Sequence, residues 1–135
     1  MQKIDLKKLF EAAFLASDNS YAPYSQFPVG AALLMENGDV ITGCNVENRS
    51  YGLTNCAERS AVFSAVSSGY RTFKALAIAA PKADYPVGPC GACRQVLTEF
   101  ASPETPVIFG SRFENAVIKT LGELYPFDSL HELKK

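Results

Sequence analysis

The sequence has no excess of charge of either sign. Lysine and arginine total 13 and aspartate and glutamate total 14, which gives a formal net charge of −1. A protein that binds the phosphate backbone usually carries a basic excess, so nucleic acid is not an expected partner. Long apolar runs are also lacking: the longest covers residues 75–80, far short of the roughly 20 residues that a membrane helix needs.

Signals for export, repeats and linkers are lacking as well. The N-terminal segment carries Asp5 and Glu11 and has no apolar core of the kind found in secretory signals. We therefore expect a cytoplasmic protein. Hydrophobic residues make up 47% of the chain, which is enough for a globular core. We expect residues 1–135 to form a single domain.

Cysteine is scarce but informatively spaced. The four cysteines are Cys44, Cys56, Cys90 and Cys93. Two disulfides would suit a secreted protein, but no export signal supports that interpretation. In a reducing compartment, the C-x-x-C pair at 90–93 and the separate Cys56 favour metal binding or redox chemistry. Cys44 lies between Gly43 and Asn45 within a predicted strand, where core packing is its simplest role.

Periodicity predicts the elements of an α/β fold. An amphipathic helix is indicated where apolar residues recur at helical spacing near the N-terminus: Leu6, Leu9, Phe10, Ala13 and Phe14. Strands are predicted over 27–35 and 40–46, and Asn37-Gly38 between them predicts a hairpin turn because both positions tolerate positive φ. Asn55 and Glu58 resemble a capping box at the start of a second helix.

The second half of the chain continues the alternation. We predict a buried strand over 73–80, a helix from about Cys90, and strands over 106–110 and 116–119. Thr120 and Glu123 predict a capped turn, and residues 129–133 a last one. The order predicts a three-layer α/β fold, with a mixed five-stranded sheet flanked by helices.

The three cysteines suit a zinc site. Cys90 and Cys93 lie three residues apart at a predicted helix start, and Cys56 can supply a third thiolate from the start of the other helix. Helix N-termini stabilise thiolates, and catalytic zinc typically has three protein ligands plus water. Arg59 is predicted to donate to cysteine sulfurs and offset their charge. Glu58 is a candidate general acid and base, although regular helical spacing alone would not point it at the metal.

The sequence around these residues resembles the zinc-dependent cytidine deaminases. Cys56-Ala57-Glu58 followed by the stretch at 89–95, Pro-Cys-Gly-Ala-Cys-Arg-Gln, matches the signature of the zinc deaminases. The segments at 21–27, 43–48 and 56–59 further resemble the small homotetrameric type. The resemblance extends over nearly the whole chain. It departs at 124–127, where Phe127 follows Pro126 directly instead of after a short gap.

The resemblance implies a reaction and a role for each residue. Free cytidine and deoxycytidine would be hydrolysed to uridine and deoxyuridine in pyrimidine salvage, with one zinc ion per subunit. Cys56, Cys90 and Cys93 would hold the zinc, and Glu58 would take a proton from the attacking water, deliver a proton to N3 and then help ammonia leave. The substrate-binding residues implied are Phe27 against the pyrimidine, the Ala57 N–H on the base carbonyl, and Asn45 and Glu47 on the ribose 3′-hydroxyl.

The resemblance also implies a homotetramer with sites shared between subunits. Tyr51 would approach a neighbouring subunit's site, and Phe127 would cover the base. Three other interpretations stay open at this stage: a blasticidin-type or other nucleoside deaminase of the same superfamily, a deaminase that edits RNA or DNA, and a zinc-stapled binding module without activity. A closed structural site that uses Cys44 as a fourth ligand belongs to the last of these.

Overall fold

The structure is a computed structural model and describes residues 4–128 and 131–133. Five strands form one sheet in the order β2-β1-β3-β4-β5. Their bounds are β1 Gly30–Met35, β2 Val40–Cys44, β3 Phe73–Ala79, β4 Pro106–Gly110 and β5 Val117–Thr120. Only the β3–β4 pair is parallel, so the sheet is mixed, as predicted.

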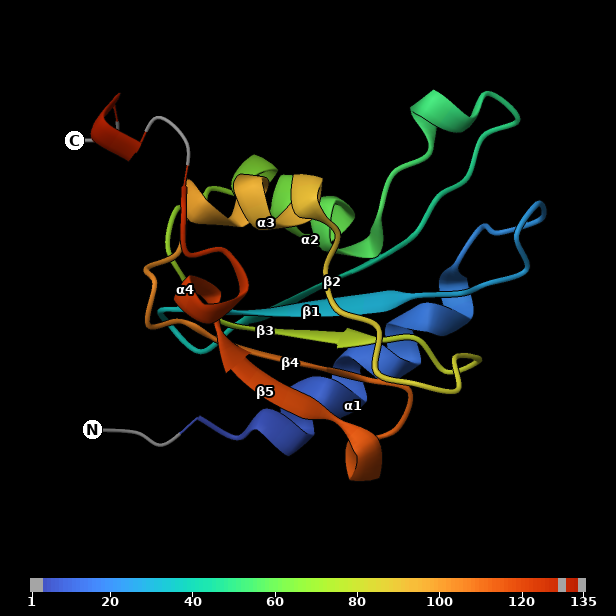
Figure 1. Ribbon diagram of the computed structural model, residues 1–135, viewed down its shortest axis with the longest axis horizontal. Helices are drawn as coiled ribbons and strands as arrows, with labels where there is room; N and C mark the ends of the chain where they lie inside the picture. The colour runs from blue at the N-terminus through green and yellow to red at the C-terminus, as the bar shows by residue number, and fades with distance from the viewer. Residues whose placement is uncertain (1–3, 129–130, 134–135) are drawn as a thin grey trace.

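Helices cover both faces of this sheet (Figure 1). Helix α1 (Leu6–Ala16) lies on one face, and α2 (Ala57–Ser67) and α3 (Gly91–Thr98) lie on the other, while the short α4 (Leu121–Leu124) follows β5. The described residues also include four 3-10 helices: η1 Ser17–Asn19, η2 Tyr51–Leu53, η3 Phe113–Asn115 and η4 His131–Leu133. The predicted three-layer arrangement is confirmed. No helix in the described part of the chain has the length and apolar character needed to span a membrane.

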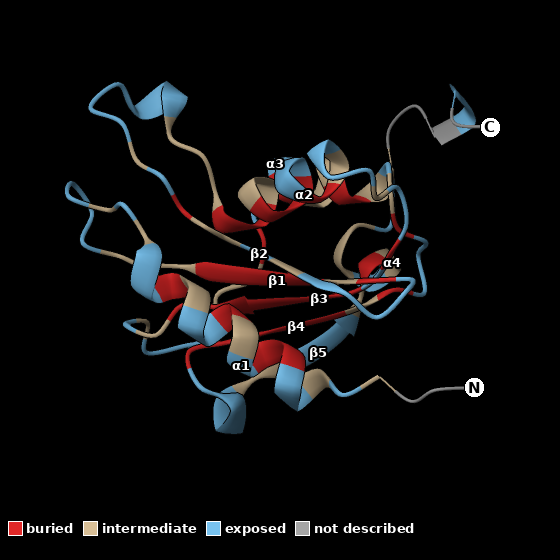
Figure 2. Cartoon of the chain, turned by 180° about the vertical axis from the view of Figure 1, so that it is seen from behind, coloured by how far each residue is buried: buried red, intermediate tan, exposed pale blue. Residues whose placement is uncertain are grey.

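The central strand β3 divides the core into two layers. Its large residues Leu76 and Ile78 face α2 and α3, and its alanines, including Ala75 and Ala77, face α1. Figure 2 shows the buried residues gathered on the strands and on the inner sides of the helices. Small side chains on one face let α1 approach the sheet closely, and burial on both faces explains why the strand reads as a continuous apolar run.

The start of α2 differs from the predicted capping box. Cys56 is the N-cap residue, and its side chain makes no capping hydrogen bond. The backbone of Asn55 instead pairs with Val46 in both directions, at 2.9 and 3.0 Å, so the helix begins only after this bridge. The predicted box is therefore wrong. The second predicted box is confirmed: Thr120 and Glu123 cap α4 reciprocally.

Two predicted strands are shorter than expected. β1 begins at Gly30 rather than at Phe27, because Pro28 has no N–H and the Asn45 side chain takes up the backbone groups on either side of it. β2 ends at Cys44 rather than at residue 46. The hairpin turn is present, but only Gly38 has a positive φ, at 94°. β5 is displaced by one residue, and residues 129–130 of the last predicted turn lie outside the described residues.

Gly43 sets the distance between β2 and α2. A Cβ placed there would lie 2.4 Å from Ala61 N and 2.8 Å from Ala57 O, well inside van der Waals contact. These atoms are helix backbone, which cannot rotate aside as a side chain can. The absence of a side chain at Gly43 therefore lets the first two turns of α2 lie directly on the strand.

We expect Gly43→Ala to lower the free energy of unfolding by about 1–3 kcal/mol, because the added methyl overpacks the β2–α2 contact. Urea unfolding monitored by circular dichroism measures this change. Gly52→Ala is the matched control, since a Cβ at Gly52 meets nothing within 4 Å. A Gly43 variant as stable as the Gly52 variant would contradict the close approach.

Candidate functional site

Cysteines stand at the start of two neighbouring helices. Cys56 is the N-cap of α2 and Cys90 is the N-cap of α3, both in extended backbone conformation and neither with a side-chain cap. Cys93 lies in the first turn of α3. The first N–H groups of a helix have no intrahelical acceptor, so both helix starts direct partial positive charge at the sulfurs.

The three sulfur atoms converge on one point. The Sγ atoms of Cys56, Cys90 and Cys93 all lie within 4.8 Å of one another. The Cys56–Cys90 separation is 3.8 Å and the Cys90–Cys93 separation is 3.4 Å. Tetrahedral zinc with Zn–S bonds of about 2.3 Å needs sulfurs roughly 3.8 Å apart, whereas a disulfide needs about 2.0 Å. The geometry therefore fits one metal ion and excludes a disulfide.

Charge in the cluster leads to the same conclusion. The hydrogen bond from the Cys93 thiol, together with Arg59, lowers the pKa of Cys56 to about 5. The pKa of Cys93 is raised, because its proton is shared with the Cys56 thiolate and because the residue is buried. Without a cation, the first thiolate suppresses the second. Three thiolates this close require a divalent ion, which is the chemistry of a zinc site.

Cys44 is not part of this group. It lies at the end of β2, half-buried with a free thiol, and the cluster found among the described residues holds only the other three cysteines. Three protein ligands are the number typical of catalytic zinc, whereas structural sites usually have four. A closed four-cysteine site is therefore not supported.

Glu58 lies in the first turn of α2 and is buried, with 5% of its surface exposed. Cys56 is in extended rather than helical conformation, so the regular i, i+2 helix spacing does not apply between the two residues. Burial raises the pKa of Glu58 to about 7, and the negative charge of the Cys56 thiolate adds to the shift. A carboxyl group that titrates near neutrality can both accept and donate a proton.

Arg59 contacts the cluster directly. Its Nη2 donates to Cys56 Sγ at 3.3 Å, and this hydrogen bond raises the pKa of the guanidinium further. Among the buried side-chain nitrogen and oxygen atoms of the described residues, Arg59 Nε is the one that has no hydrogen-bond partner. Native structures rarely leave such a donor unsatisfied away from functional sites. The positively charged guanidinium group of Arg59 is thus held against the cysteine sulfurs, where it offsets their negative charge.

Asn45 is tied to the segment that carries Phe27. Its Oδ1 accepts from Val29 N at 2.9 Å and from the Ser20 hydroxyl, and its Nδ2 donates to Phe27 O at 2.9 Å. Phe27 is half-buried and follows Gln26, whose φ of 54° lies in the left-handed region. The Asn45 amide therefore replaces a strand partner for residues 27–29 and sets the direction of the chain at Phe27.

Glu47 organises the neighbouring turn. One carboxylate oxygen accepts from Tyr24 N at 3.0 Å and from Ser25 N at 3.1 Å, and the other accepts from the Ser25 hydroxyl. These hydrogen bonds, the Ser25 hydroxyl first, lower the pKa of Glu47. Glu47, Tyr24 and Tyr51 line a pocket of about 300 Å³. The Val46–Asn55 bridge joins this region to the residue before Cys56.

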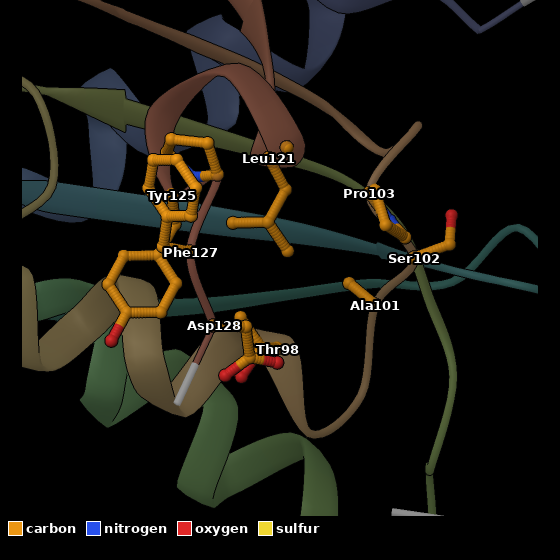
Figure 3. A pocket seen from close by; sticks show the side chains of 10 residues that line it. Thr98, Ala101, Ser102, Pro103, Leu121, Tyr125, Phe127 and Asp128 are labelled. Atoms are coloured by element: carbon orange, nitrogen blue, oxygen red, sulfur yellow. The ribbon is translucent and has the colours of Figure 1, made fainter. Parts of the chain in front are cut away.

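Tyr51 and Phe127, two of the three aromatic residues predicted to bind substrate, lie apart from the cysteines. Tyr51 is 79% exposed, on a segment that projects from the body of the molecule in Figure 1. Phe127 is 88% exposed and lines a pocket of about 760 Å³ with Thr98 and Tyr125. Figure 3 shows this pocket between the C-terminal end of α3 and the segment after α4. None of its lining residues is a cysteine or Glu58.

A comparison with protein families shows to which family a chain with this arrangement of cysteines belongs. Residues 3–109 match the model of the cytidine and deoxycytidylate deaminase zinc-binding region. The chain belongs to the cytidine and deoxycytidylate deaminase family. The metal that Cys56, Cys90 and Cys93 would hold is therefore zinc, in agreement with the sulfur spacing.

Individual relatives of this deaminase match it over nearly their whole length. A cytidine deaminase from Sporosarcina psychrophila is 49% identical over 123 residues, which cover 91% of this chain and 90% of the relative. A probable cytidine deaminase from Dictyostelium discoideum is 42% identical over 132 residues, covering 96% and 90%. The crystal structure of a cytidine deaminase from Burkholderia pseudomallei superposes with a TM-score of 0.87 at 46% identity, covering 93% and 99%.

Sequence reasoning about this deaminase missed several residues that hold the site. Ser20 and Ser25 hold Asn45 and Glu47, and each lies more than 20 residues from its partner along the chain. No local pattern marks such contacts. Arg94 and Gln95 form hydrogen bonds to the C-terminal segment across 30 residues or more, and only their place in the C-x-x-C motif could have drawn attention to them.

We expect Cys93→Ser to remove zinc from the purified protein, because the variant lacks a buried thiolate that closes the ligand triangle. Cys44→Ser is the matched control and should retain about one zinc ion per chain. Atomic absorption after gel filtration measures both. Loss of zinc from the Cys44 variant, or full zinc in the Cys93 variant, would show that the metal lies elsewhere.

Proposed function

We propose that the protein is a zinc-dependent hydrolase that deaminates free cytidine and deoxycytidine to uridine and deoxyuridine. The observation that carries this proposal is the group of three cysteine sulfurs beside the buried Glu58, at the starts of α2 and α3. Family membership and relatives named cytidine deaminase over nine-tenths of the chain support it. We also propose that residues 1–135 act as one deaminase domain in cytoplasmic pyrimidine salvage.

Proton transfer is the part of the reaction that the chain itself performs. Zinc, when bound, supplies Lewis-acid chemistry that makes water nucleophilic near neutral pH. Glu58 takes one proton from the water that attacks C4 and passes it to N3, and it then takes the second proton from the hydroxyl group now on C4 and passes it to the leaving amino group. Water and cytidine thus become uridine and ammonia, with Glu58 restored to its starting state. Burial of Glu58 excludes bulk water from these transfers.

Recognition of the nucleoside falls to residues around the same helix start. The Ala57 N–H, in the first turn of α2, donates to the base carbonyl, since α2 has no side-chain cap that would occupy it. Phe27 packs against the pyrimidine. Asn45 and Glu47 bind the ribose 3′-hydroxyl, with one Nδ2 hydrogen of Asn45 and remaining lone pairs of Glu47 available beyond the contacts described above. Arg59 moderates the charge of the thiolates.

The rival interpretations are less well supported. A binding module without activity leaves the buried carboxyl of Glu58 beside a three-ligand metal site unexplained. A blasticidin-type deaminase does not account for relatives named cytidine deaminase that match over nine-tenths of the chain. Action on RNA or DNA fits poorly with a net charge of −1.

We expect the zinc-loaded protein to deaminate cytidine and 2′-deoxycytidine, followed by the fall in ultraviolet absorbance. 3′-Deoxycytidine should react at least about 10-fold more slowly, because groups that bind the hydroxyl are left unpaired. Blasticidin S should not react. Chelation should abolish the activity and added zinc should restore it. Activity that persists in fully zinc-free protein, or a folded zinc-loaded sample inert toward cytidine, would contradict the proposal.

We expect Glu58→Gln to lower kcat for cytidine by about 100-fold or more, because glutamine keeps the shape but cannot accept a proton. Zinc content should stay unchanged, which separates chemistry from metal binding. Glu36→Gln, on the exposed hairpin turn, is the control and should match the wild type. A Glu58 variant of full activity would remove the carboxyl group from the mechanism.

We further propose a homotetramer whose sites are shared between subunits. Tyr51 and Leu53 are 79% and 70% exposed on the projecting segment, and Phe63 is 52% exposed on the outer side of α2. Exposed large apolar side chains that lie together, as Tyr51 and Leu53 do on η2, are typical of interfaces. Phe127, exposed and away from the cysteines of its own chain, is free to cover a base in a neighbouring site.

Sedimentation equilibrium should give about four times the chain mass of 14.6 kDa. Tyr51→Asp should lower both the mass and the activity, because a charge replaces an apolar contact at the shared site. Leu15→Asp, on α1 at the other face of the sheet, is the comparison variant, since Leu15 is also exposed, at 67%. A monomeric, fully active wild type would contradict the shared site.

A further inference from the structure

Arg94 bridges two backbone carbonyl groups that lie outside its own helix. Its Nε donates to Pro89 O at 2.7 Å, and its Nη1 donates to Leu124 O at 2.6 Å. Pro89 immediately precedes the ligand Cys90, and Leu124 ends α4. One side chain thus joins the backbone before a metal ligand to the C-terminal part of the chain.

Apart from the buried ring of Pro89, the backbone before Cys90 has little other support. Residues 85–90 contain two prolines and a glycine and form no helix or strand. Proline has no N–H, so Pro86 and Pro89 cannot donate a backbone hydrogen bond. Cys90 itself is exposed and receives no side-chain cap. The position of its sulfur therefore depends on how this loop is held.

Arg94 and Phe109 hold the loop from two directions. A Cβ placed at Gly88 would lie 3.4 Å from Phe109 Cε2 and 3.6 Å from Arg94 Nη2, which is van der Waals contact. The guanidinium therefore lies along the loop as well as bonding to its last carbonyl. A charged planar group that donates through two nitrogens at once is a strong and well-oriented brace.

The segment that carries Leu124, the second acceptor of Arg94, is also held in place. Tyr125 Oη donates to Gln95 Oε1 at 2.6 Å, and Gln95 Nε2 donates to Asp128 Oδ1 at 3.2 Å. These contacts attach the segment after α4 to α3, next to Arg94. The Leu124 carbonyl is thus a firm anchor rather than part of a loose end.

We propose that Arg94 is a positioning residue for the zinc site, which holds the Pro89–Cys90 backbone so that Cys90 Sγ stays beside Cys56 and Cys93. The C-terminal segment thereby contributes to metal retention although it supplies no ligand. Arg59 acts on a sulfur directly, whereas the bonds of Arg94 described above go to carbonyl oxygens, so the two arginines serve different purposes.

The test is the rate at which the full-length, zinc-loaded protein releases zinc to an excess of a coloured chelator. Arg94→Met should release zinc about 10-fold faster than the wild type, the scale typical for loss of a group that orients a metal ligand. Arg94→Lys keeps the positive charge but offers a single point donor, so its rate should fall between the two. The readout involves no substrate, so its failure is distinguishable from failure of the proposed reaction.

Arg71 provides a matched control. Its Nη1 donates to Val66 O and Tyr70 O, both at 2.9 Å, at the end of α2 opposite Cys56. Arg71→Met loses the same kind of carbonyl-bridging arginine, so it should lose stability without faster zinc release. The rates are compared at temperatures equally far below each variant's Tm.

Three results would overturn the proposal: a wild-type rate for Arg94→Met, equal acceleration in Arg71→Met, or a wild-type rate for Arg94→Lys. The second would mean that lower stability alone releases zinc, and the third that charge rather than the two-nitrogen contact matters. If Arg94→Met does not fold, Arg94→Lys against Arg71→Lys decides in the same way, with faster release from the former supporting the proposal and equal rates rejecting it.

Discussion

The convergence of three cysteine sulfurs within 4.8 Å of one another is the constraint on which the rest of the structure depends. Three thiolates at this distance would repel one another, and a proton shared between Cys93 and Cys56 lowers the pKa of Cys56 while it raises the pKa of Cys93. Two helix starts, one arginine and a divalent ion are needed to hold them together. The fold must place each of these groups, because the three cysteines come from the starts of two different helices. The close β2–α2 contact and the loop before α3 are therefore parts of the metal site.

The elements of the fold were readable because they follow simple periodicities. The 3.6-residue spacing of α1 and the apolar run at 75–80, which overlaps β3, identified both correctly. The errors lie where backbone groups bind something other than a regular partner. Asn55 pairs with Val46 instead of capping α2, and residues 27–29 bind the Asn45 side chain instead of extending β1. A pattern of apolar positions carries no information about such exchanges.

The residues of the candidate site also fall into two groups, those that a sequence pattern predicts and those that only the folded structure brings together. The grouping of Cys56, Cys90 and Cys93, with Glu58 in the first turn of α2, was predictable because zinc chemistry requires particular residue types at particular spacings. The residues that orient Asn45 and Glu47, such as Ser20 and Ser25, are common polar residues that become meaningful only after the chain has folded. Arg94 is intermediate: its position in the motif was visible, but its two acceptors are backbone carbonyls, which every residue has.

Asn45 and Glu47 combine a structural role with the ribose-binding role proposed for them. Both side chains bind backbone groups at the point where β1 and β2 stop pairing, so they replace the hydrogen bonds that a longer strand would have made. A strand in that place would have covered the polar groups of residues 24–29. An amide and a carboxylate have more hydrogen-bonding positions than these contacts use, so one Nδ2 hydrogen of Asn45 and lone pairs of Glu47 stay available. The shortened strands are thus the physical origin of the polar surface around Asn45 and Glu47, and an apolar replacement of either residue would disturb the backbone and the proposed ribose contact together.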